Sequence, residues 1–247
     1  MEQVAEIQKF QRFSTTGPSE TTRPPNNRCG FETCDGWWRL QEGRARPCMI
    51  CRRHRLTEVV PERFSIPLTE LQPTELIAST VSLKRQARVL DLIRADPCAN
   101  LLLMGRSGCG KTQLLHSLYL DAAERSEYGE IFVISETREI VSDLRDSEIN
   151  ESRSHPPILS ALRIKEWHRS GKRVSIFLDE FHKAGIHTDW TIGVLHDLVD
   201  AIYQVRHSGR LRFCATTNLL SDEFIAQLGG SLYRRLEDIC TVIEFDS

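Results

Sequence analysis

One short segment constrains the fold of this chain more than any other feature. It reads GRSGCGKT from Gly105 to Thr112 and follows directly on the apolar run Leu101–Met104. The pattern G-x-x-x-x-G-K-T, placed after a buried strand and before a helix, is typical of a phosphate-binding loop (P-loop). Its glycines let the backbone wrap around a phosphate group with the N–H groups pointing inward. The sequence therefore predicts that this chain binds a nucleoside triphosphate.

The residues of this loop have separate expected roles. Lys111 can reach the β- and γ-phosphates of ATP, and the Thr112 hydroxyl can bind Mg²⁺. The thiol of Cys109 is incidental, because the loop binds phosphate through its backbone. The predicted nucleotide-binding residues are Gly105, Ser107, Gly108, Cys109, Gly110, Lys111, Thr112, Gln113 and Asp179.

A second apolar strand ends in two acids. Residues 174–178 lead straight into Asp179 and Glu180, which places both carboxylates at the carboxyl edge of the sheet. Open α/β folds bind their ligands at this edge. We expect Asp179 to hold Mg²⁺ through water, and Glu180 to orient and polarise the water that attacks the γ-phosphate. The alternative is a pair of solvated acids at the start of a helix.

Two later segments carry weaker signals. The strand 211–216 runs into Thr217 and Asn218. An amide at that edge can bond the γ-phosphate or the attacking water, although Thr-Asn after a strand is also a common turn. Near the end of the chain, Arg234 and Arg235 lie in a predicted helix. An exposed arginine there can reach the γ-phosphate of a neighbouring subunit, and surface charge on a helix is the alternative.

Composition agrees with a soluble globular protein, at 40% hydrophobic and 27% charged residues. The net charge of −2 gives no bulk attraction to nucleic acid or acidic membranes, so any such binding must be local. No apolar run approaches the length of a membrane span, and the amino terminus lacks the pattern of a signal peptide. We therefore expect a cytoplasmic protein whose eight cysteines are thiols or metal ligands.

The composition and the hydrophobic pattern of the sequence divide the chain into four parts. Residues 1–28 are expected to be a flexible segment, because their polar, proline-rich tract cannot pack. Residues 29–60 form a predicted zinc-binding module, and residues 61–98 form a linker with a leading helix. From 99 to 247, strands alternate with helices. This alternation predicts an α/β fold of the P-loop NTPase class, a parallel sheet flanked by helices.

The expected strands are 101–104, 131–135, 173–178, 211–216 and 241–245. The expected helices are 80–95, 111–125, 137–147, 158–170 and 190–207, with two short ones before the last strand. Ser221, followed by two acids, is expected to cap the first of these short helices.

The order P-loop, strand-Asp-Glu, strand-Thr-Asn, helix-Arg-Arg-Leu resembles the AAA+ ATPases. More narrowly, it resembles the DnaC/IstB-type branch of replicative helicase loaders and transposition ATPases. The resemblance spans about 99–245 and is carried by residues 100–115, 177–180, 202–206, 216–219 and 232–236. It implies that Asn218 is the sensor 1 residue and that Arg235 is the arginine finger, with Arg234 in reserve.

Two further features bear on this resemblance. The chain stops two residues after the last expected strand, without room for a helical lid, and loaders of this branch likewise lack that lid. Phe181 and His182, after the acidic pair, depart from the loader pattern and are similar to some transposition ATPases. This departure concerns which protein is the partner, a helicase or a transposase, more than it concerns the chemistry of the ATP site.

Four cysteines form the pairs C-x4-C and C-x2-C. Cys29, Cys34, Cys48 and Cys51 suit tetrahedral Zn²⁺, which can order a segment too small for its own core. His54 is an alternate ligand, and four reduced thiols in a loop are the alternative interpretation. Some helicase loaders carry an N-terminal zinc-binding module, in agreement with the resemblance. The tryptophans and arginines between these cysteines suit single-stranded nucleic acid or, as we favour, a docked protein.

The sequence and the resemblance together predict a helicase loader that binds ATP to assemble and hydrolyses it to release. The expected catalytic residues are Glu180, Asn218 and Arg235; the expected cofactors are ATP, Mg²⁺ at Thr112 and Asp179, and Zn²⁺. Expected partners are a replicative helicase or a transposase, single-stranded or double-stranded DNA, and further copies of the chain, with no membrane. The alternatives are a transposition regulator that delivers a transposase to target DNA, and a zinc-dependent nucleotide-binding adaptor with little turnover.

Overall fold

The computed structural model describes residues 38–41, 44–76, 81–127, 129–149, 157–183 and 188–245. The chain separates into two compact units, Met1–Pro61 and Glu62–Ser247. In the first unit, strands β1 (Trp38–Gln41) and β2 (Arg44–Pro47) pair antiparallel, and helix α2 (Met49–Glu58) follows them. Within the described residues, no helix has both the length and the apolar character needed to cross a membrane.

A five-stranded sheet forms the centre of the second unit. Its strands are β3 (Leu101–Met104), β4 (Ile131–Glu136), β5 (Val174–Asp179), β6 (Leu211–Thr217) and β7 (Thr241–Glu244). They lie in the order β4-β5-β6-β3-β7, and every neighbouring pair is parallel. The predicted parallel α/β sheet is therefore confirmed, and the carboxyl ends of all its strands meet at one edge.

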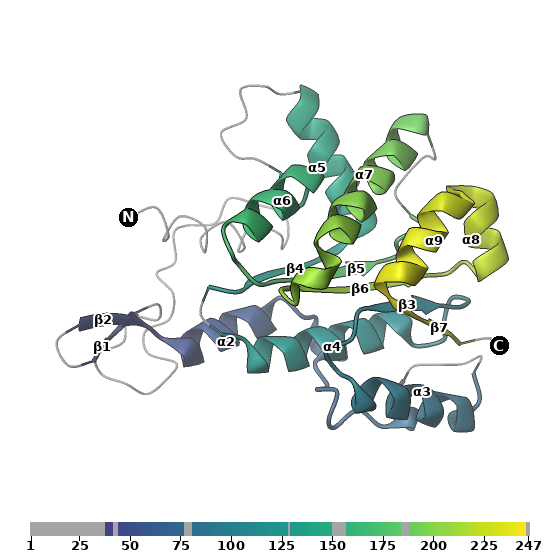
Figure 1. Ribbon diagram of the computed structural model, residues 1–247. Helices are drawn as coiled ribbons and strands as arrows, with labels where there is room; N and C mark the ends of the chain where they lie inside the picture. Colours follow the sequence, from purple (N-terminus) through teal and green to yellow (C-terminus); the bar gives the residue numbers. More distant parts are fainter. Residues whose placement is uncertain are drawn as a thin grey trace. The chain divides into compact units, whose positions relative to one another are not determined.

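Helices cover both faces of this sheet, as Figure 1 shows. On one face lie α3 (Leu83–Ala95) and α4 (Lys111–Arg125). On the other face lie α5 (Thr137–Ile149), α6 (Ala161–Arg169), α7 (Asp189–Val205), α8 (Ser221–Leu228) and α9 (Gly230–Ile239). Three short 3-10 turns complete the unit: η2 (Glu62–Phe64), η3 (Pro73–Glu75) and η4 (Arg206–Ser208). Strands covered on both faces must be apolar along their whole length, which explains the continuous hydrophobic runs in the sequence.

The predicted elements differ from the structure mainly at their ends. The helix expected from 158 begins at Ala161, because the Ser160 hydroxyl accepts from the Arg163 N–H at 3.2 Å and caps it. The expected cap at Ser221 is wrong. Helix α8 starts at Ser221 itself, and the Glu223 carboxylate accepts from the Leu220 N–H at 3.0 Å.

Asn100 fastens the amino ends of three strands. Its side chain accepts from the Phe213 N–H at 2.8 Å and donates to the Ile239 carbonyl at 3.2 Å. Its own carbonyl accepts from the Thr241 N–H at 2.9 Å. These bonds hold β3 in register with both of its neighbours, so the loop after Met104 starts at a defined place on the sheet edge.

The segment before α3 packs along the helices of the same face. The Ser117 hydroxyl on α4 donates to the Ile66 carbonyl at 2.6 Å, and the Arg94 guanidinium on α3 donates to the Leu68 carbonyl at 3.2 Å. Leu76, in the same segment, lies against Gly110, the residue before α4. A Cβ atom added to Gly110 would lie 3.2 Å from the Leu76 Cβ.

We expect Gly110→Ala to destabilise the protein. Gly110 has φ +91°, a left-handed conformation that costs an L residue about 1–2 kcal/mol, and the new methyl group would press on Leu76. Denaturant unfolding without nucleotide measures the change. The matched control is Gly193→Ala in helix α7, where a Cβ meets no atom within 4 Å. Removing a glycine from a helix interior should stabilise by about 0.5–1 kcal/mol, so equal effects in the two variants would contradict this account of Gly110.

Candidate nucleotide-binding site

The P-loop connects β3 to α4 at the carboxyl edge of the sheet. Gly108 and Gly110 have φ of +83° and +91°, conformations that side chains other than glycine rarely adopt. They turn the chain so that α4 begins directly at Lys111. The positive end of the α4 dipole and its first N–H groups therefore lie next to the loop, an arrangement that favours a bound phosphate.

Lys111 keeps its ammonium group inside the P-loop. The residue is 5% exposed, and Nζ donates to the carbonyls of Gly105 at 2.6 Å and Arg106 at 2.9 Å. The thiol of Cys109 lies 3.2 Å from the same nitrogen. A buried cation surrounded by neutral acceptors is well placed to bond an anionic ligand, because phosphate oxygens are stronger acceptors than carbonyls.

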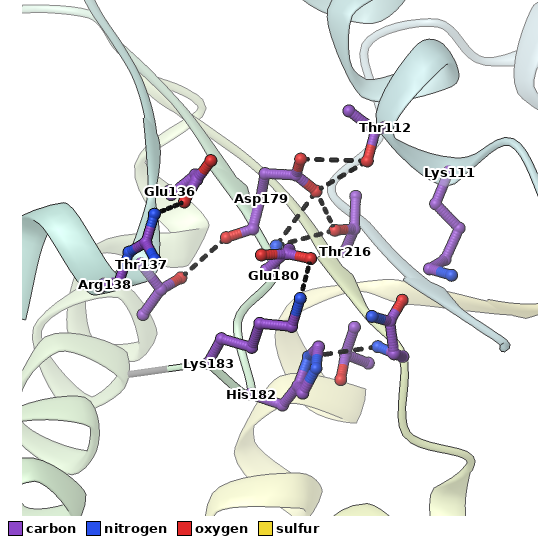
Figure 2. Close-up of polar contacts among 12 residues, drawn as sticks. Lys111, Thr112, Glu136, Thr137, Arg138, Asp179, Glu180, His182, Lys183 and Thr216 are labelled. Atoms are coloured by element: carbon purple, nitrogen blue, oxygen red, sulfur yellow. Dashed lines mark hydrogen bonds and ion pairs between the residues drawn. The ribbon is translucent and has the colours of Figure 1, made fainter. Parts of the chain in front are cut away.

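Asp179 is the centre of the polar contacts at this edge (Figure 2). Its two carboxylate oxygens lie 3.2 and 3.0 Å from the Thr112 hydroxyl on α4. The Thr216 hydroxyl on β6 donates to Oδ1 of Asp179, and the Thr137 hydroxyl at the start of α5 donates to the Asp179 carbonyl at 3.2 Å. One aspartate of β5 therefore joins the P-loop helix to strand β6 and to the start of helix α5.

Glu180 has an unusual backbone conformation. Its φ is +52°, in the left-handed region that non-glycine residues rarely occupy. Its N–H holds this conformation by donating to Asp179 Oδ1 and to the Thr216 hydroxyl, both at 3.0 Å. Figure 2 shows the Glu180 carboxylate close to the ammonium group of Lys183. Oε1 of Glu180 and Nζ of Lys183 are 2.5 Å apart. The turn thus separates the two neighbouring carboxylates into two different environments.

Asn218 lies just beyond the end of β6. Its N–H donates to Nδ1 of His182 at 3.2 Å, which joins the loops that follow β5 and β6. Both side chains are partly exposed at the same sheet edge as Asp179. The predicted residues of the P-loop, the acidic pair and Asn218 therefore converge on this edge.

Arg235 lies elsewhere, on helix α9. Its guanidinium forms an ion pair with Asp200 of helix α7 at 2.7 Å, and it lies 3.5 Å from Nδ1 of His196. Arg234, the reserve candidate, is exposed. The predicted finger is thus paired within its own chain, while its neighbour faces solvent.

His116 was not expected from the sequence. It lies one helical turn after Thr112, and its ring stacks on Phe64 with the centroids 4.9 Å apart. Burial lowers the pKa of His116 to about 4; the nearby Asp179 carboxylate opposes this shift and Arg63 adds to it. The ring is therefore neutral near pH 7. Its Nδ1 is buried and has no hydrogen-bond partner among the described residues.

Three polar residues of the site were also missed: Thr137, Lys183 and Thr216. Thr216 is a neighbour of Asp179 because Leu178 pairs with Ala215, a register that only the structure provides. The contact between Lys183 and Glu180 follows from the turn at Glu180, which no sequence pattern announces.

The predicted zinc ligands are described only in part. Cys48 precedes helix α2 and Cys51 lies in its first turn; both are buried and contact each other. Cys29 and Cys34 lie outside the described residues. Within the described part of the chain, no three His, Cys, Asp or Glu side chains form a metal-binding group. Nδ1 of His54 lies 3.5 Å from the Glu58 carboxylate, one helical turn away.

Comparison with known proteins identifies the fold of the second unit. No protein-family model and no curated protein matches the chain. Among solved structures, a DnaC helicase loader is similar at 16% identity with a TM-score of 0.53, over 75% of this chain and 99% of that one. AMPPCP-bound DnaA from Aquifex aeolicus is similar at 12% identity with a TM-score of 0.51, over 75% of this chain and 50% of that one. The chain thus spans about half the length of DnaA, and its second unit has the P-loop AAA+ fold.

Proposed function

We propose that the chain is an AAA+ ATPase of DNA replication that acts as a helicase loader. It would bind ATP to assemble with a replicative helicase and single-stranded DNA, and hydrolyse ATP to release them. The contact between the Thr112 hydroxyl and the Asp179 carboxylate carries the enzymatic part of this proposal. The similarity in fold to a DnaC helicase loader supports the class of partner.

The residues at the site fit Mg²⁺ and ATP. Thr112 and Asp179 offer a hydroxyl and a carboxylate only 3.0 Å apart, and hard oxygen donors of this kind are the ligands that Mg²⁺ prefers. Bound Mg²⁺ would neutralise charge on the phosphates. Lys111 would add a second positive charge from inside the loop, where its ammonium group already lies against loop carbonyls. The P-loop backbone would hold the phosphates in place.

Glu180 is the proposed general base. Its carboxylate would accept a proton from the water that attacks the γ-phosphate, and Lys183 would set the direction in which that carboxylate points. Asn218, at the end of the neighbouring strand, would hold the same water or the γ-phosphate through its amide. The positive φ of Glu180 supports this role, since strained backbone positions cluster at functional sites.

The partner is tested by capturing proteins with the purified full chain in the presence of ATP. Retention of a hexameric helicase supports the loader; retention of a transposase instead supports a transposition regulator. Turnover measured with and without single-stranded DNA separates an enzyme from an adaptor. A protein that binds ATP, shows no turnover in either condition and captures no helicase would contradict the proposal.

We expect Lys111→Ala and Glu180→Gln to fail in different ways. Losing the charge-assisted bonds of Lys111 should weaken ATP binding by roughly tenfold or more. Losing the general base should keep ATP binding and lower kcat by about 100-fold or more. The matched control is Glu136→Gln, which removes an acid from the same sheet edge, opposite Asp179 in the register, and should retain turnover. Equal loss of ATP binding in the first two variants would show that the role of Glu180 is wrong.

Arg235 is the proposed arginine finger, acting on the nucleotide of the next subunit. Arg235→Ala should lower turnover by roughly 10³ and leave the ATP affinity of the isolated chain nearly intact. Asp200→Asn breaks the same ion pair without removing the arginine, so it should retain turnover. Mixing the inactive Arg235→Ala and Lys111→Ala chains should restore part of the activity.

Two outcomes would contradict the role of Arg235. If Arg235→Ala and Asp200→Asn behave alike, Arg235 only joins α9 to α7. If Arg234→Ala alone is inactive, Arg234 is the finger.

We propose that Cys29, Cys34, Cys48 and Cys51 hold about one Zn²⁺ per chain. The burial and mutual contact of Cys48 and Cys51 support this set. Metal analysis of the purified protein should find the zinc, and Cys48→Ser/Cys51→Ser should lose it. Cys98→Ser, which changes an exposed cysteine of the other unit, should retain it. A wild-type chain free of metal would refute the proposed site.

A further inference from the structure

A groove of about 510 Å³ runs between helix α3 and strand β7, at one edge of the sheet (Figure 1). Arg88, Leu92 and Asp96 line it from the side of α3, and Val242 lines it from β7. None of the residues assigned above to the nucleotide site is part of this lining. The groove is therefore a separate feature of the second unit.

Strand β7 leaves backbone groups open on the side of the groove. It is the end strand of the sheet, and among the described strands it pairs only with β3. The Thr241 N–H donates to the Asn100 carbonyl at 2.9 Å, on the side of β3. Backbone groups of successive residues in a strand point to alternate sides, so Val242 directs its N–H and carbonyl away from β3. Such an edge is a template for pairing with another chain.

Arg85 limits how long such a pairing can be. Its guanidinium donates to the Glu244 carbonyl at 2.5 Å and so covers the carboxyl end of the edge. The part that stays open is centred on Val242. It suits a short contact between two strands better than a long added strand.

Three side chains form a stripe along the α3 side of the groove. Arg88, Leu92 and Asp96 follow one another at intervals of four residues, which places them on one side of the helix. Leu92, in the middle of the stripe, is 57% exposed. Arg88 and Asp96 are exposed one turn before it and one turn after it. The stripe is thus apolar at its centre, positive at one end and negative at the other.

Contacts within the chain do not account for the two charges of the stripe. Neither Arg88 nor Asp96 forms an ion pair with any described residue. Asp96 accepts from the Cys98 N–H at 3.2 Å, but it directly follows the carboxyl end of α3, where the helix dipole disfavours an acid. A cation opposite Asp96 and an anion opposite Arg88 would stabilise both.

Helix α3 and strand β7 run in opposite directions along the groove. Arg85, in the first turn of α3, bonds Glu244 at the end of β7. After α3, the chain turns into Leu101, which pairs with Thr241 at the start of β7. A two-fold axis perpendicular to the groove therefore sets two copies of α3 antiparallel and, at the same time, two copies of β7 antiparallel.

The order of the stripe is complementary to itself about such an axis. In a two-fold contact, residue i meets residue j of the other copy, and j meets i. With the axis at Leu92, the two leucines meet, and each Arg88 lies opposite Asp96 of the other copy. Antiparallel strands also let two Val242 residues exchange both of their backbone hydrogen bonds.

We propose that this groove joins two copies of the chain in a two-fold dimer. A second copy is the occupant that the surface selects, because the face itself carries the required charges in the required order. The dimer does not depend on the proposed ATPase or loader function and should form without nucleotide. The proposed finger Arg235 does not line the groove, so its contact with a neighbouring subunit would use a different surface.

The first test measures the mass of the full chain by analytical ultracentrifugation over a range of concentrations, without nucleotide. Wild type should show a monomer–dimer equilibrium. Leu92→Glu should raise its dissociation constant by roughly tenfold or more, because the substitution enters the centre of the contact twice. The matched control is Leu83→Glu: Leu83 is also 57% exposed on α3 but does not line the groove, so this variant should dimerise like wild type. Thermal unfolding checks that both variants fold.

The second test exchanges the charges of the stripe. Arg88→Asp and Asp96→Arg each place like charges opposite each other, so each should weaken the dimer by roughly tenfold, and more at low salt. The double variant Arg88→Asp/Asp96→Arg restores complementary pairs and should recover most of the wild-type affinity. Residues that act only within their own helix would show no such recovery.

Three outcomes would overturn the dimer. These are a wild-type chain that stays monomeric at its highest soluble concentration, equal dimerisation of Leu92→Glu and wild type, and a double variant no better than the single ones. A monomeric chain whose Leu92→Glu variant loses helicase capture would assign the groove to that partner instead. If turnover and helicase capture are absent while dimerisation still depends on Leu92, the dimer is right and the loader function is wrong.

Discussion

The carboxylate of Asp179 holds together the parts of the nucleotide site. It accepts from Thr112 on the P-loop helix and from Thr216 on β6, and the N–H of Glu180 bonds to the same group. Without these bonds, the P-loop helix, two strands and the turn at Glu180 would have no common anchor. The arrangement places the negative charge of Asp179 at the carboxyl edge of the sheet. Hydroxyl and N–H donors lower the electrostatic cost of this charge. The proposed magnesium-binding role would use the same property, since donors that surround a carboxylate also orient its oxygens.

Much of the second unit could be predicted from the sequence, and for physical reasons. Parallel strands covered on both faces, such as β3, are apolar throughout, so they stand out from the amphipathic helices between them. The P-loop requires glycine at positions such as Gly108 and Gly110, where φ is positive. Because these glycines are required, the motif can be recognised in the sequence. Asp179 follows from the same logic, because the first polar residue after a buried strand must lie at the edge of the sheet.

The parts that could not be predicted depend on contacts between residues distant in the sequence. Ser221 has the composition of a helix cap, but its hydroxyl bonds Tyr233 at 2.7 Å and the helix starts one residue earlier than a cap would allow. The partner of Arg235 lies 35 positions away, in another helix, where no local pattern indicates it. The strands of the hairpin β1–β2 alternate apolar and polar residues, but over only four residues each, the shortest run in which such alternation indicates a strand.

The polarity of the parallel sheet places polar residues of the candidate nucleotide site at the carboxyl ends of two neighbouring strands. Strand β5 begins beside Arg173 and ends at Asp179; strand β6 begins beside Arg210 and ends at Thr216 and Thr217. These strands are buried and paired in register, so their relative position is fixed by backbone hydrogen bonds and packing. Asp179 and Thr216 are therefore held side by side at the carboxyl edge, where the Thr216 hydroxyl donates to the Asp179 carboxylate. A site that must hold phosphates and a metal ion at defined positions needs such a preorganised pair, and here the hydrogen-bonded strands provide it.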